Sequence, residues 1–252
     1  MAFAPVLRPV VALRSGRTRG SLLDRLMRED GVEKPADAGL ARLSDYDIEQ
    51  IDRNLLETGL MAIKTLHGRE PSKVLFAPAA FSTLNSPRGR REVLGLIDHA
   101  QLRLKAQVVL EVSHLDPGLP PSRLVEVLAQ LRPVCTTVFA RIKPDRASIM
   151  ALSDCALAGA SIQASDLKSP EDAEFLTRIR LVMLSVGPRL ILHNLRSIAA
   201  INAAHAAGIS YASLDLTQMG GKMPRMPTRP EPAKADPVRA DENGGEVSPA
   251  AA

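Results

Sequence analysis

Short apolar runs alternate with longer amphipathic stretches along most of the chain. The short runs predict eight strands, at residues 6–13, 17–22, 73–77, 107–112, 137–142, 160–164, 189–193 and 210–214. Apolar residues at helical spacing predict helices at residues 46–66, 87–100, 121–131, 147–157, 169–186 and 197–207. Alternating strands and helices favour a mostly parallel sheet with helical cover, and eight strands suffice to close a barrel.

The first two predicted strands have an unusually short connection. Only Arg14, Ser15 and Gly16 separate them. A parallel pair needs a crossover of a dozen or more residues, so these strands must form an antiparallel hairpin. We therefore expect an α/β barrel over residues 1–216 with one antiparallel strand at its N-terminus.

Residues 217–252 differ in character from the rest of the chain. They contain six prolines and mixed charges, and they show no apolar periodicity. Such a segment cannot bury enough apolar surface to offset the entropy of ordering it. We predict a disordered tail, and whether it has a docking role stays open.

Composition limits the classes of function. The chain is 45% hydrophobic with a formal net charge of +4, which suits one globular domain and does not call for nucleic acid. No apolar run approaches about 18 residues, and the N-terminus lacks the basic region of a secretory signal. Two cysteines, Cys135 and Cys155, are most simply reduced core thiols. We expect a cytoplasmic protein that does not bind membranes.

Four segments carry a resemblance to a known family. They are LRPVVALRSGR at 7–17, DIEQIDRNLL at 47–56, VVLEVS at 108–113 and RLILHNLRS at 189–197, the last followed by Gly208. Their order and spacing over about 200 residues resemble the EAL-domain cyclic di-GMP phosphodiesterases. GLPPSRL at 118–124 also resembles a family motif, but here it follows VVLEVS instead of preceding it. The resemblance implies an EAL-like TIM-type (β/α)8 barrel.

The resemblance also implies where a phosphodiesterase site would lie. The family holds two divalent metals with carboxylates and an Asn at the C-terminal ends of the strands, and such metals generate the nucleophile and clamp the phosphate. Among the corresponding positions only Glu111 is acidic. The others are Leu22, Ala77, His114, Arg141, Ile142, Gln163, His193, Arg196 and Ser213, and no acidic residue near the strand ends is expected to replace the lost ligands.

Arginines at these positions oppose a metal. A unit charge pair about 4 Å apart is worth about 4 kcal/mol at an effective dielectric of 20. We therefore expect no metal, no cofactor and no two-metal hydrolysis. The mouth of the barrel is instead expected to be basic and to be a candidate site for an anionic ligand, formed by Glu111, Arg141, Lys143, Gln163, His193, Asn194 and Arg196.

Three functions remain open at this stage. The first is a catalytically inactive EAL-like protein that regulates or scaffolds bacterial signalling, with a protein partner and, by resemblance, a homodimer. The second is a metal-independent receptor for cyclic di-GMP or another nucleotide in the barrel mouth. The third is an enzyme of new chemistry, with Glu111 as its base.

Two further features have structural explanations. Residues 86–91, SPRGRR, form a basic run, but Ser86 and Pro87 are typical of the start of a helix. No aromatic platform accompanies the run, so we expect a solvated helix face instead of a nucleic-acid site. The histidines and cysteines lack HxxxH and CxxC spacing, which argues against zinc.

Overall fold

The strands form a closed barrel. The computed structural model describes residues 2–29, 32–35, 39–66, 74–116, 118–221 and 223–224. Its strands are β1 (Ala2–Ala12), β2 (Arg17–Glu29), β3 (Val32–Pro35), β4 (Val74–Ala80), β5 (Gln107–Ser113), β6 (Val138–Arg141), β7 (Gly159–Gln163), β8 (Arg189–Leu195) and β9 (Tyr211–Leu214). The sheet runs β1-β9-β8-β7-β6-β5-β4-β2-β3, and the additional β1–β2 pairing closes eight of these strands into a ring.

The antiparallel strand lies where the sequence predicts it. β1 pairs antiparallel with β2 on one side and with β9 on the other, while the pairs from β2–β4 round to β8–β9 are parallel. The β1–β2 hairpin is long, since its register extends from Ala12↔Arg17 to Ala2↔Arg28. Parallel β1–β2 pairing is impossible across so short a turn, and the predicted α/β barrel with one antiparallel strand is confirmed.

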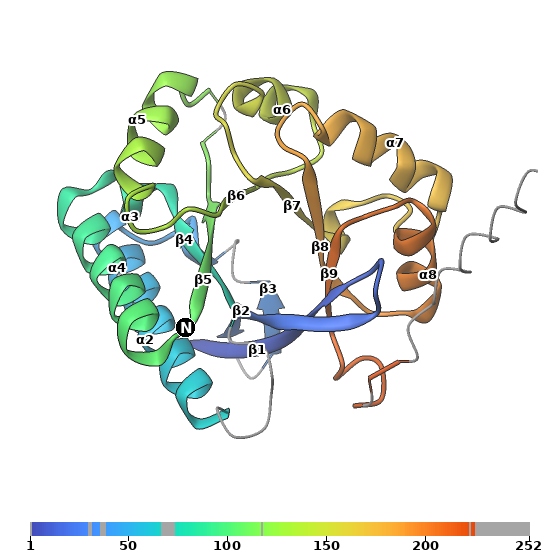
Figure 1. Ribbon diagram of the computed structural model, residues 1–252, viewed down its shortest axis with the longest axis horizontal. Helices are drawn as coiled ribbons and strands as arrows, with labels where there is room; N and C mark the ends of the chain where they lie inside the picture. The colour runs from blue at the N-terminus through green and yellow to red at the C-terminus, as the bar shows by residue number, and fades with distance from the viewer. Residues whose placement is uncertain are drawn as a thin grey trace, which may run out of the picture.

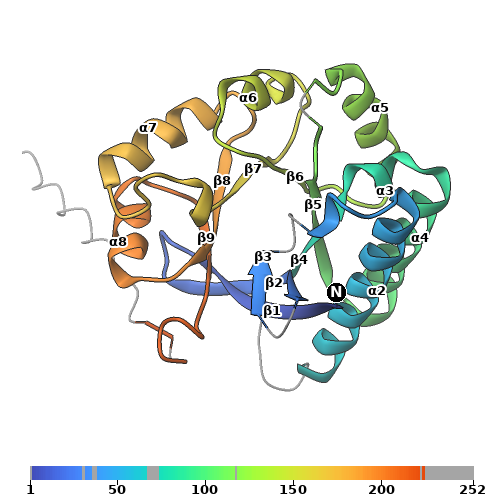
Figure 2. The same cartoon turned by 180° about the vertical axis from the view of Figure 1, so that it is seen from behind.

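Helices cover the outside of the ring. They are α2 (Asp45–Leu66), α3 (Phe81–Asn85), α4 (Pro87–His99), α5 (Pro121–Leu131), α6 (Arg146–Leu152), α7 (Ala173–Met183) and α8 (Ile198–Ala206), with a π turn at Ala100–Leu104 and a 3-10 turn at Ala164–Asp166. They follow an arc around the barrel, and the β1–β2 hairpin lies across the side that no labelled helix covers (Figures 1 and 2).

Two of the three apolar clusters among the described residues lie on the two faces of the barrel sheet. The larger lies between the sheet and the helices and contains residues such as Ala77, Leu110 and Leu124. The smaller, which we call the apolar layer, fills the barrel interior with Val10, Leu22, Phe76, Val109, Phe139 and Ile191. Side chains of a strand alternate between these two clusters, as a strand with period two requires.

The predicted elements agree with the structure apart from their ends and four small additions. β3, α3 and the two short turns were not predicted, and β2 continues to Glu29 instead of ending at residue 22. α6 ends at Leu152 and α7 begins after its N-cap Asp172, so both are shorter than their periodicity indicated. The first residues of the predicted tail, 217–221, form turns, with Met219 packed on the larger cluster. Residues 225–252 of that tail lie outside the described residues.

Candidate functional site

A polar layer lies directly above the apolar layer, at the end of the barrel where the parallel strands finish. We call this end the barrel mouth. Two residues beyond Leu22, Val109 and Ile191 on their strands come Asp24, Glu111 and His193. Alternation places each pair on the same face of its strand, so these polar side chains point into the barrel like the apolar ones below them. Among the described residues, the polar layer contains Arg8, Asp24, Glu111, Arg141, Gln163, His193, Asn194, Ser213 and Asp215.

Glu111 is the centre of the first ion cluster in this layer. It is 2% exposed, and the Arg141 guanidinium donates from Nε to Glu111 Oε2 at 2.9 Å. His193 Nε2 lies 2.6 Å from the other carboxylate oxygen, Oε1. His193 Nδ1 in turn lies 3.3 Å from the Ser213 hydroxyl. A carboxylate can only accept here, so the proton between His193 and Glu111 belongs to Nε2.

Electrostatics keep Glu111 ionised although it is buried. Burial on its own would raise the pKa of Glu111, because it disfavours the charged form. The charges of Arg141 and His193 and the hydrogen bond from His193 together outweigh burial, and the pKa of Glu111 lies well below its ordinary value. Such a carboxylate is a weak proton acceptor near neutral pH.

A second ion cluster connects the first strand to the last. Arg8 donates from Nε to Asp24 at 3.2 Å, and its Nη1 lies 2.7 Å from Asp215. All three side chains are less than one tenth exposed. Asp215 also lies 3.4 Å from Arg196 Nε, although the Arg196 side chain is 65% exposed. Since Arg8 is on β1 and Asp215 follows β9, this cluster spans the point where the barrel closes.

Asn194 joins the second cluster to β7 through an irregularity in β8. Its backbone has φ of 60°, in the left-handed region, and the β8–β9 register shifts between Leu192 and Leu195. Its N–H donates to the Ser213 hydroxyl at 2.9 Å in place of a strand partner. Its side-chain Nδ2 donates to Asp24 at 3.0 Å and to Gln163 at 2.9 Å. Asn is among the few residues that adopt this conformation readily, and such bulges re-aim side chains at sites.

The structure places the predicted site residues in two groups. Glu111, Arg141 and His193 meet in the first cluster, while Gln163 and Asn194 contact each other beside the second. Lys143 and Arg196 are exposed outside the polar layer.

The barrel mouth is less strongly basic than its predicted residues alone indicated. Asp24, Asp215 and Arg8 were missed, and together with Glu111 the two aspartates offset Arg8, Arg141 and Arg196. Acidic residues therefore do lie near the strand ends. Asp24 lies two residues after Leu22 and therefore on the same face of the strand. This spacing would have identified Asp24 if the second strand had been predicted to continue beyond residue 22.

Some positions assigned from the resemblance face away from the mouth. Ala77 and Ile142 pack in the larger cluster against the helices, so neither could present a ligand to the barrel interior. Pro78, one residue further, is in register with Glu111. Leu22 belongs to the apolar layer, below the level of the carboxylates. The family position that was assigned to Ala77 therefore corresponds to Pro78, which has neither an acidic nor an amide side chain.

The carboxylates of the mouth do not fit a pair of divalent metals. Asp24 Oδ1 accepts the N–H of Arg25 at 2.9 Å, and with the contacts above each of the six oxygens of Asp24, Glu111 and Asp215 has a protein donor or cation. Among the described residues, no three His, Cys, Asp or Glu side chains gather where they could hold a metal ion.

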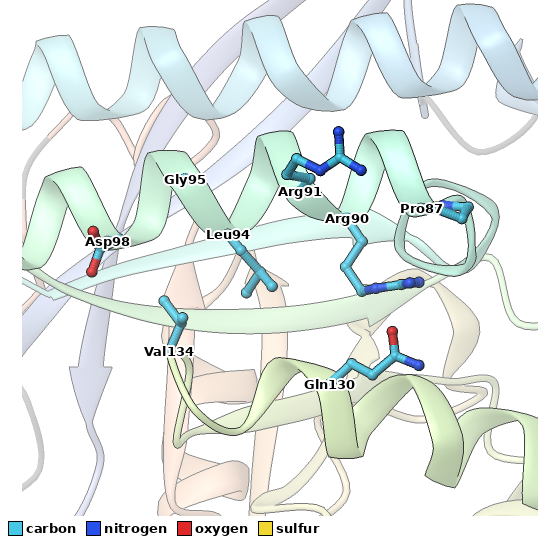
Figure 3. A pocket seen from close by; sticks show the side chains of 8 residues that line it. All are labelled: Pro87, Arg90, Arg91, Leu94, Gly95, Asp98, Gln130 and Val134. Carbon is cyan, nitrogen blue, oxygen red and sulfur yellow. The ribbon is translucent and has the colours of Figure 1, made fainter.

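The basic run at residues 86–91 has the structural role expected of it. Ser86 accepts the N–H of Gly89 as N-cap of α4, with Pro87 in the first turn. Arg88 bonds Glu49 at 2.6 Å, and Arg90 donates to the carbonyl of Leu84 at 2.7 Å. Figure 3 shows Arg90 pointing from α4 toward Gln130, beside a hollow of about 570 Å³. The Arg88 bond joins α4 to α2, and the Arg90 bond joins α4 to α3.

None of the helices among the described residues is both long enough and apolar enough to span a bilayer.

Comparison with known proteins shows the same barrel in EAL-domain structures. PaMucR phosphodiesterase, in a c-di-GMP complex, is 13% identical with a TM-score of 0.65 over 85% of this chain and 90% of its own. Bacillus subtilis YkuI, with an EAL domain, substrate c-di-GMP and calcium, is 14% identical with a TM-score of 0.64 over 83% of this chain and 53% of its own. The Pseudomonas aeruginosa FimX EAL domain bound to c-di-GMP is 18% identical with a TM-score of 0.58, over 84% and 87%.

No family model matches the chain, and no curated protein matches it by sequence. At these identities the structural likeness concerns the fold. The chain has an EAL-like barrel.

Proposed function

We propose that this EAL-like barrel does not hydrolyse cyclic di-GMP with two metals and acts instead as a regulatory or scaffolding protein in bacterial signalling. The observation that carries the proposal is the engagement of all six carboxylate oxygens in the barrel mouth. Arg141 pairs with Glu111, and Arg8 pairs with both Asp24 and Asp215.

A metal would have to displace those cations. Mg²⁺ demands near-ideal octahedral oxygen coordination and dehydrates reluctantly. Freeing Glu111 for it would leave the buried Arg141 guanidinium, 11% exposed, without its carboxylate. Breaking a buried pair costs about 3–5 kcal/mol, and the new dication would also repel the arginine. Each step opposes the metal site that the hydrolysis requires.

Incubation with cyclic di-GMP and millimolar Mg²⁺ or Mn²⁺ tests the catalytic part of the proposal. We expect no linear dinucleotide above the level of buffer, while an active EAL phosphodiesterase run in parallel cleaves the substrate. The matched control is Glu111→Gln, purified in the same way. Cleavage by the parent chain that disappears in Glu111→Gln would refute the proposal, whereas equal cleavage by both would reveal a contaminant.

The regulatory part requires a protein partner, which affinity capture tests. The full chain and a chain ending at Leu216 would serve as baits, and bound proteins would be identified by mass spectrometry. We expect at least one partner to be retained by both, because the barrel is the folded part common to them. Sedimentation of the same material would show whether the barrel forms a homodimer. If neither bait retains a partner or self-associates, scaffolding loses its support.

A metal-independent receptor is the second candidate. Its support is the exposed rim, where Lys143 and Arg196 remain able to meet an anion. Titration of cyclic di-GMP without metal would raise the apparent stability by about 2.7 kcal/mol at a hundred times the dissociation constant. Arg196→Gln should weaken this effect. Failure of every cyclic dinucleotide and mononucleotide to shift the melting temperature would remove the candidate.

An enzyme with Glu111 as general base is the least supported candidate. Both carboxylate oxygens of Glu111 already accept from Arg141 and His193, and the pKa of Glu111 lies well below the range that suits a base near neutral pH. Any activity of the chain that survives Glu111→Gln would eliminate this candidate.

A further inference from the structure

A cavity lies at the end of the barrel opposite the mouth, where the parallel strands begin. Its volume is about 940 Å³, and we call it the lower cavity. Four separate parts of the fold line it: the β1–β2 turn, α7, the start of β8 and the segment from α8 into β9. The turn of the hairpin lies beside α8 in both views of the fold (Figures 1 and 2). The closed barrel therefore assembles this cavity from segments that are distant in sequence.

The lining of the lower cavity is basic. Its cationic side chains are those of Arg14, Arg180 and Arg189, with His205 beside them, and none of its lining residues is acidic. Among the residues that the structure describes, none forms a hydrogen bond or an ion pair with these four side chains. Arg19 also lines the cavity but has a partner, so it is not counted among them. In the mouth, by contrast, arginine side chains pair with carboxylates.

Helix-end stabilisation explains only two of these side chains. Arg180 lies in the last turn of α7 and His205 in the last turn of α8, where cations interact favourably with the helix dipole. Arg14 belongs to the β1–β2 turn, and Arg189 is the first residue of β8, so neither of them lies at a helix end. A concave surface of one charge attracts groups of the opposite charge.

The cations are spread across the cavity. The N–H of Leu13 donates to the carbonyl of Ser210, and the N–H of Ser210 donates to the carbonyl of Leu190, both at 3.2 Å. Arg14 follows Leu13 and Arg189 precedes Leu190, so their backbones lie two strand spacings apart, about 10 Å. A chain segment that carries several carboxylates can therefore meet a different cation with each of them.

The chain itself carries a segment of the opposite charge, at residues 240–246. Its sequence, ADENGGE, contains Asp241, Glu242 and Glu246 and has neither lysine nor arginine, although the whole chain has a formal net charge of +4. We call it the acidic segment. Its carboxylates complement the guanidinium groups of the lower cavity, because carboxylate and guanidinium form charge-assisted hydrogen bonds.

The length of the chain allows the acidic segment to return to the lower cavity. Tyr211 lines the cavity, and Pro224 is the last described residue, 13 positions further on. Asp241 follows Pro224 by 17 positions. An extended chain spans at most about 3.6 Å per residue, so Pro224 lies within about 47 Å of Tyr211 and the next 17 residues reach up to about 61 Å. The acidic segment therefore reaches the cavity whatever the path between Tyr211 and Pro224.

We propose that the acidic segment docks in the lower cavity of its own chain, with its carboxylates against Arg14, Arg180 and Arg189. Arg14 and Arg189 are exposed, and exposed ion pairs are individually weak, so a free ion gains little there. A tether raises the local concentration of the acidic segment to about the millimolar range, which several weak pairs can exploit together. Docking in this way covers the lower end of the barrel.

The proposal goes beyond the function proposed for the mouth and does not depend on it. Arg189 begins β8 and His193 lies four residues further along the same strand, which is about 13 Å at the rise of a β-strand. Docking is measured on the acidic segment itself, whereas the proposed function is measured by hydrolysis and by capture of partners. Failure of one proposal can therefore be recognised without the other.

Fluorescence anisotropy of a dye attached to the full chain at Ser248→Cys provides the test. The two native cysteines are buried, so the dye reacts at position 248. The comparison is a tail variant of the same chain, in which Asp241→Asn, Glu242→Gln and Glu246→Gln are combined. At low salt we expect a higher anisotropy in the parent than in the tail variant, because docking slows the motion of the dye. About 0.5 M salt should remove the difference, since exposed pairs are screened.

Two further variants locate the docking. Arg189→Gln and Arg180→Gln should each remove at least about half of the anisotropy difference. Arg178→Gln is the matched control, because the residue is exposed on α7 outside the lining, and it should keep the difference. Melting temperatures close to that of the parent would show that all three variants are folded. The proposal is overturned if the tail variant matches the parent at low salt, or if Arg189→Gln and Arg180→Gln both behave like Arg178→Gln.

Two other occupants of the lower cavity would also be revealed. Docking within one chain does not depend on protein concentration, so dilution by about fifty-fold should leave the anisotropy difference unchanged. A difference that disappears on dilution would show docking between copies and overturn the proposal. Calorimetry with inorganic phosphate detects a small anion: equal binding to the parent and to the tail variant that is lost in Arg189→Gln would assign the cavity to that anion and would also overturn the proposal.

Discussion

Removal of Arg141 should destabilise the barrel in a way that depends on pH. Arg141 is one of two groups that compensate the buried charge of Glu111, which is 2% exposed. Replacing it with methionine keeps most of the side-chain volume and deletes the charge. Loss of one partner from a buried pair costs about 3–5 kcal/mol, and because His193 remains beside Glu111 we expect about 3 kcal/mol.

The direction of the pH effect follows from the pKa of Glu111. In the parent chain that pKa is lowered, so the stabilisation from ionised Glu111 is fully present above about pH 4.5 and is lost as the pH falls. In Arg141→Met, burial has less to oppose it and the folded-state pKa of Glu111 moves upward. The variant loses stability with rising pH only over the range between the unfolded-state pKa of Glu111 and its new, higher folded-state pKa. Its deficit should therefore be larger near about pH 8 than near about pH 5, by about 1.4 kcal/mol for each unit by which that folded-state pKa exceeds about 5.

Urea unfolding at the two pH values measures both effects. Arg178→Met, at an exposed position on α7, controls for the loss of an arginine as such and should change stability by less than about 0.5 kcal/mol. Glu111→Gln in the Arg141→Met background removes the stranded charge and should recover stability. The reasoning fails if Arg141→Met matches the control at pH 8, or if the double variant is less stable than Arg141→Met.

Three other expectations can be checked by similar means. Asn194→Ala should cost about 1–2 kcal/mol more than Asn194→Gly in urea unfolding, because alanine at φ of 60° is strained and both changes remove the same side-chain bonds; equal losses would contradict this. Gly159→Ala should destabilise the fold strongly, because a Cβ there would lie 2.0 Å from a carbonyl oxygen of the neighbouring strand. Gly95→Ala, in open space on α4, should stabilise the fold by about 0.5–1 kcal/mol. Thermal melts in which Gly159→Ala is the more stable of the two variants would refute this packing. Burial raises the pKa of Cys135 and of Cys155, so a thiol reagent should label neither until urea is added, and rapid labelling of the native chain would contradict their burial.

The sequence predicts the barrel well because its signal is local and repeated. Each strand from β4 onward is a short apolar run, and the three residues between the first two strands dictate their antiparallel pairing without any tertiary information. The polar layer is harder to predict. In the sequence, Arg8 and Asp24 resemble exposed residues of a hairpin. Closure of the ring, which residue propensities do not reveal, turns both side chains into the barrel, where Arg8 pairs with Asp24 and Asp215.

Asn194 marks a different limit of sequence reasoning. The predicted strand ends at residue 193, one residue before Asn194, and nothing in the local sequence indicates that β8 continues irregularly there. The shift in register depends on the Ser213 hydroxyl of the neighbouring strand, which takes the N–H of Asn194. That hydrogen bond joins residues 19 positions apart. Side chains that substitute for backbone partners can be recognised only when both strands are seen together.

Pairing of β1 with β9 has a consequence for how the chain is made. Val10 is in register with Ser213, so the contact joins residues about 200 positions apart. During synthesis the first strand leaves the ribosome long before its partner exists, and until then it can pair on one side only, with β2. Contacts of such long sequence separation form slowly. Until residues 211–214 have been made, β1 therefore keeps one unpaired edge, which chaperones and neighbouring nascent chains can reach.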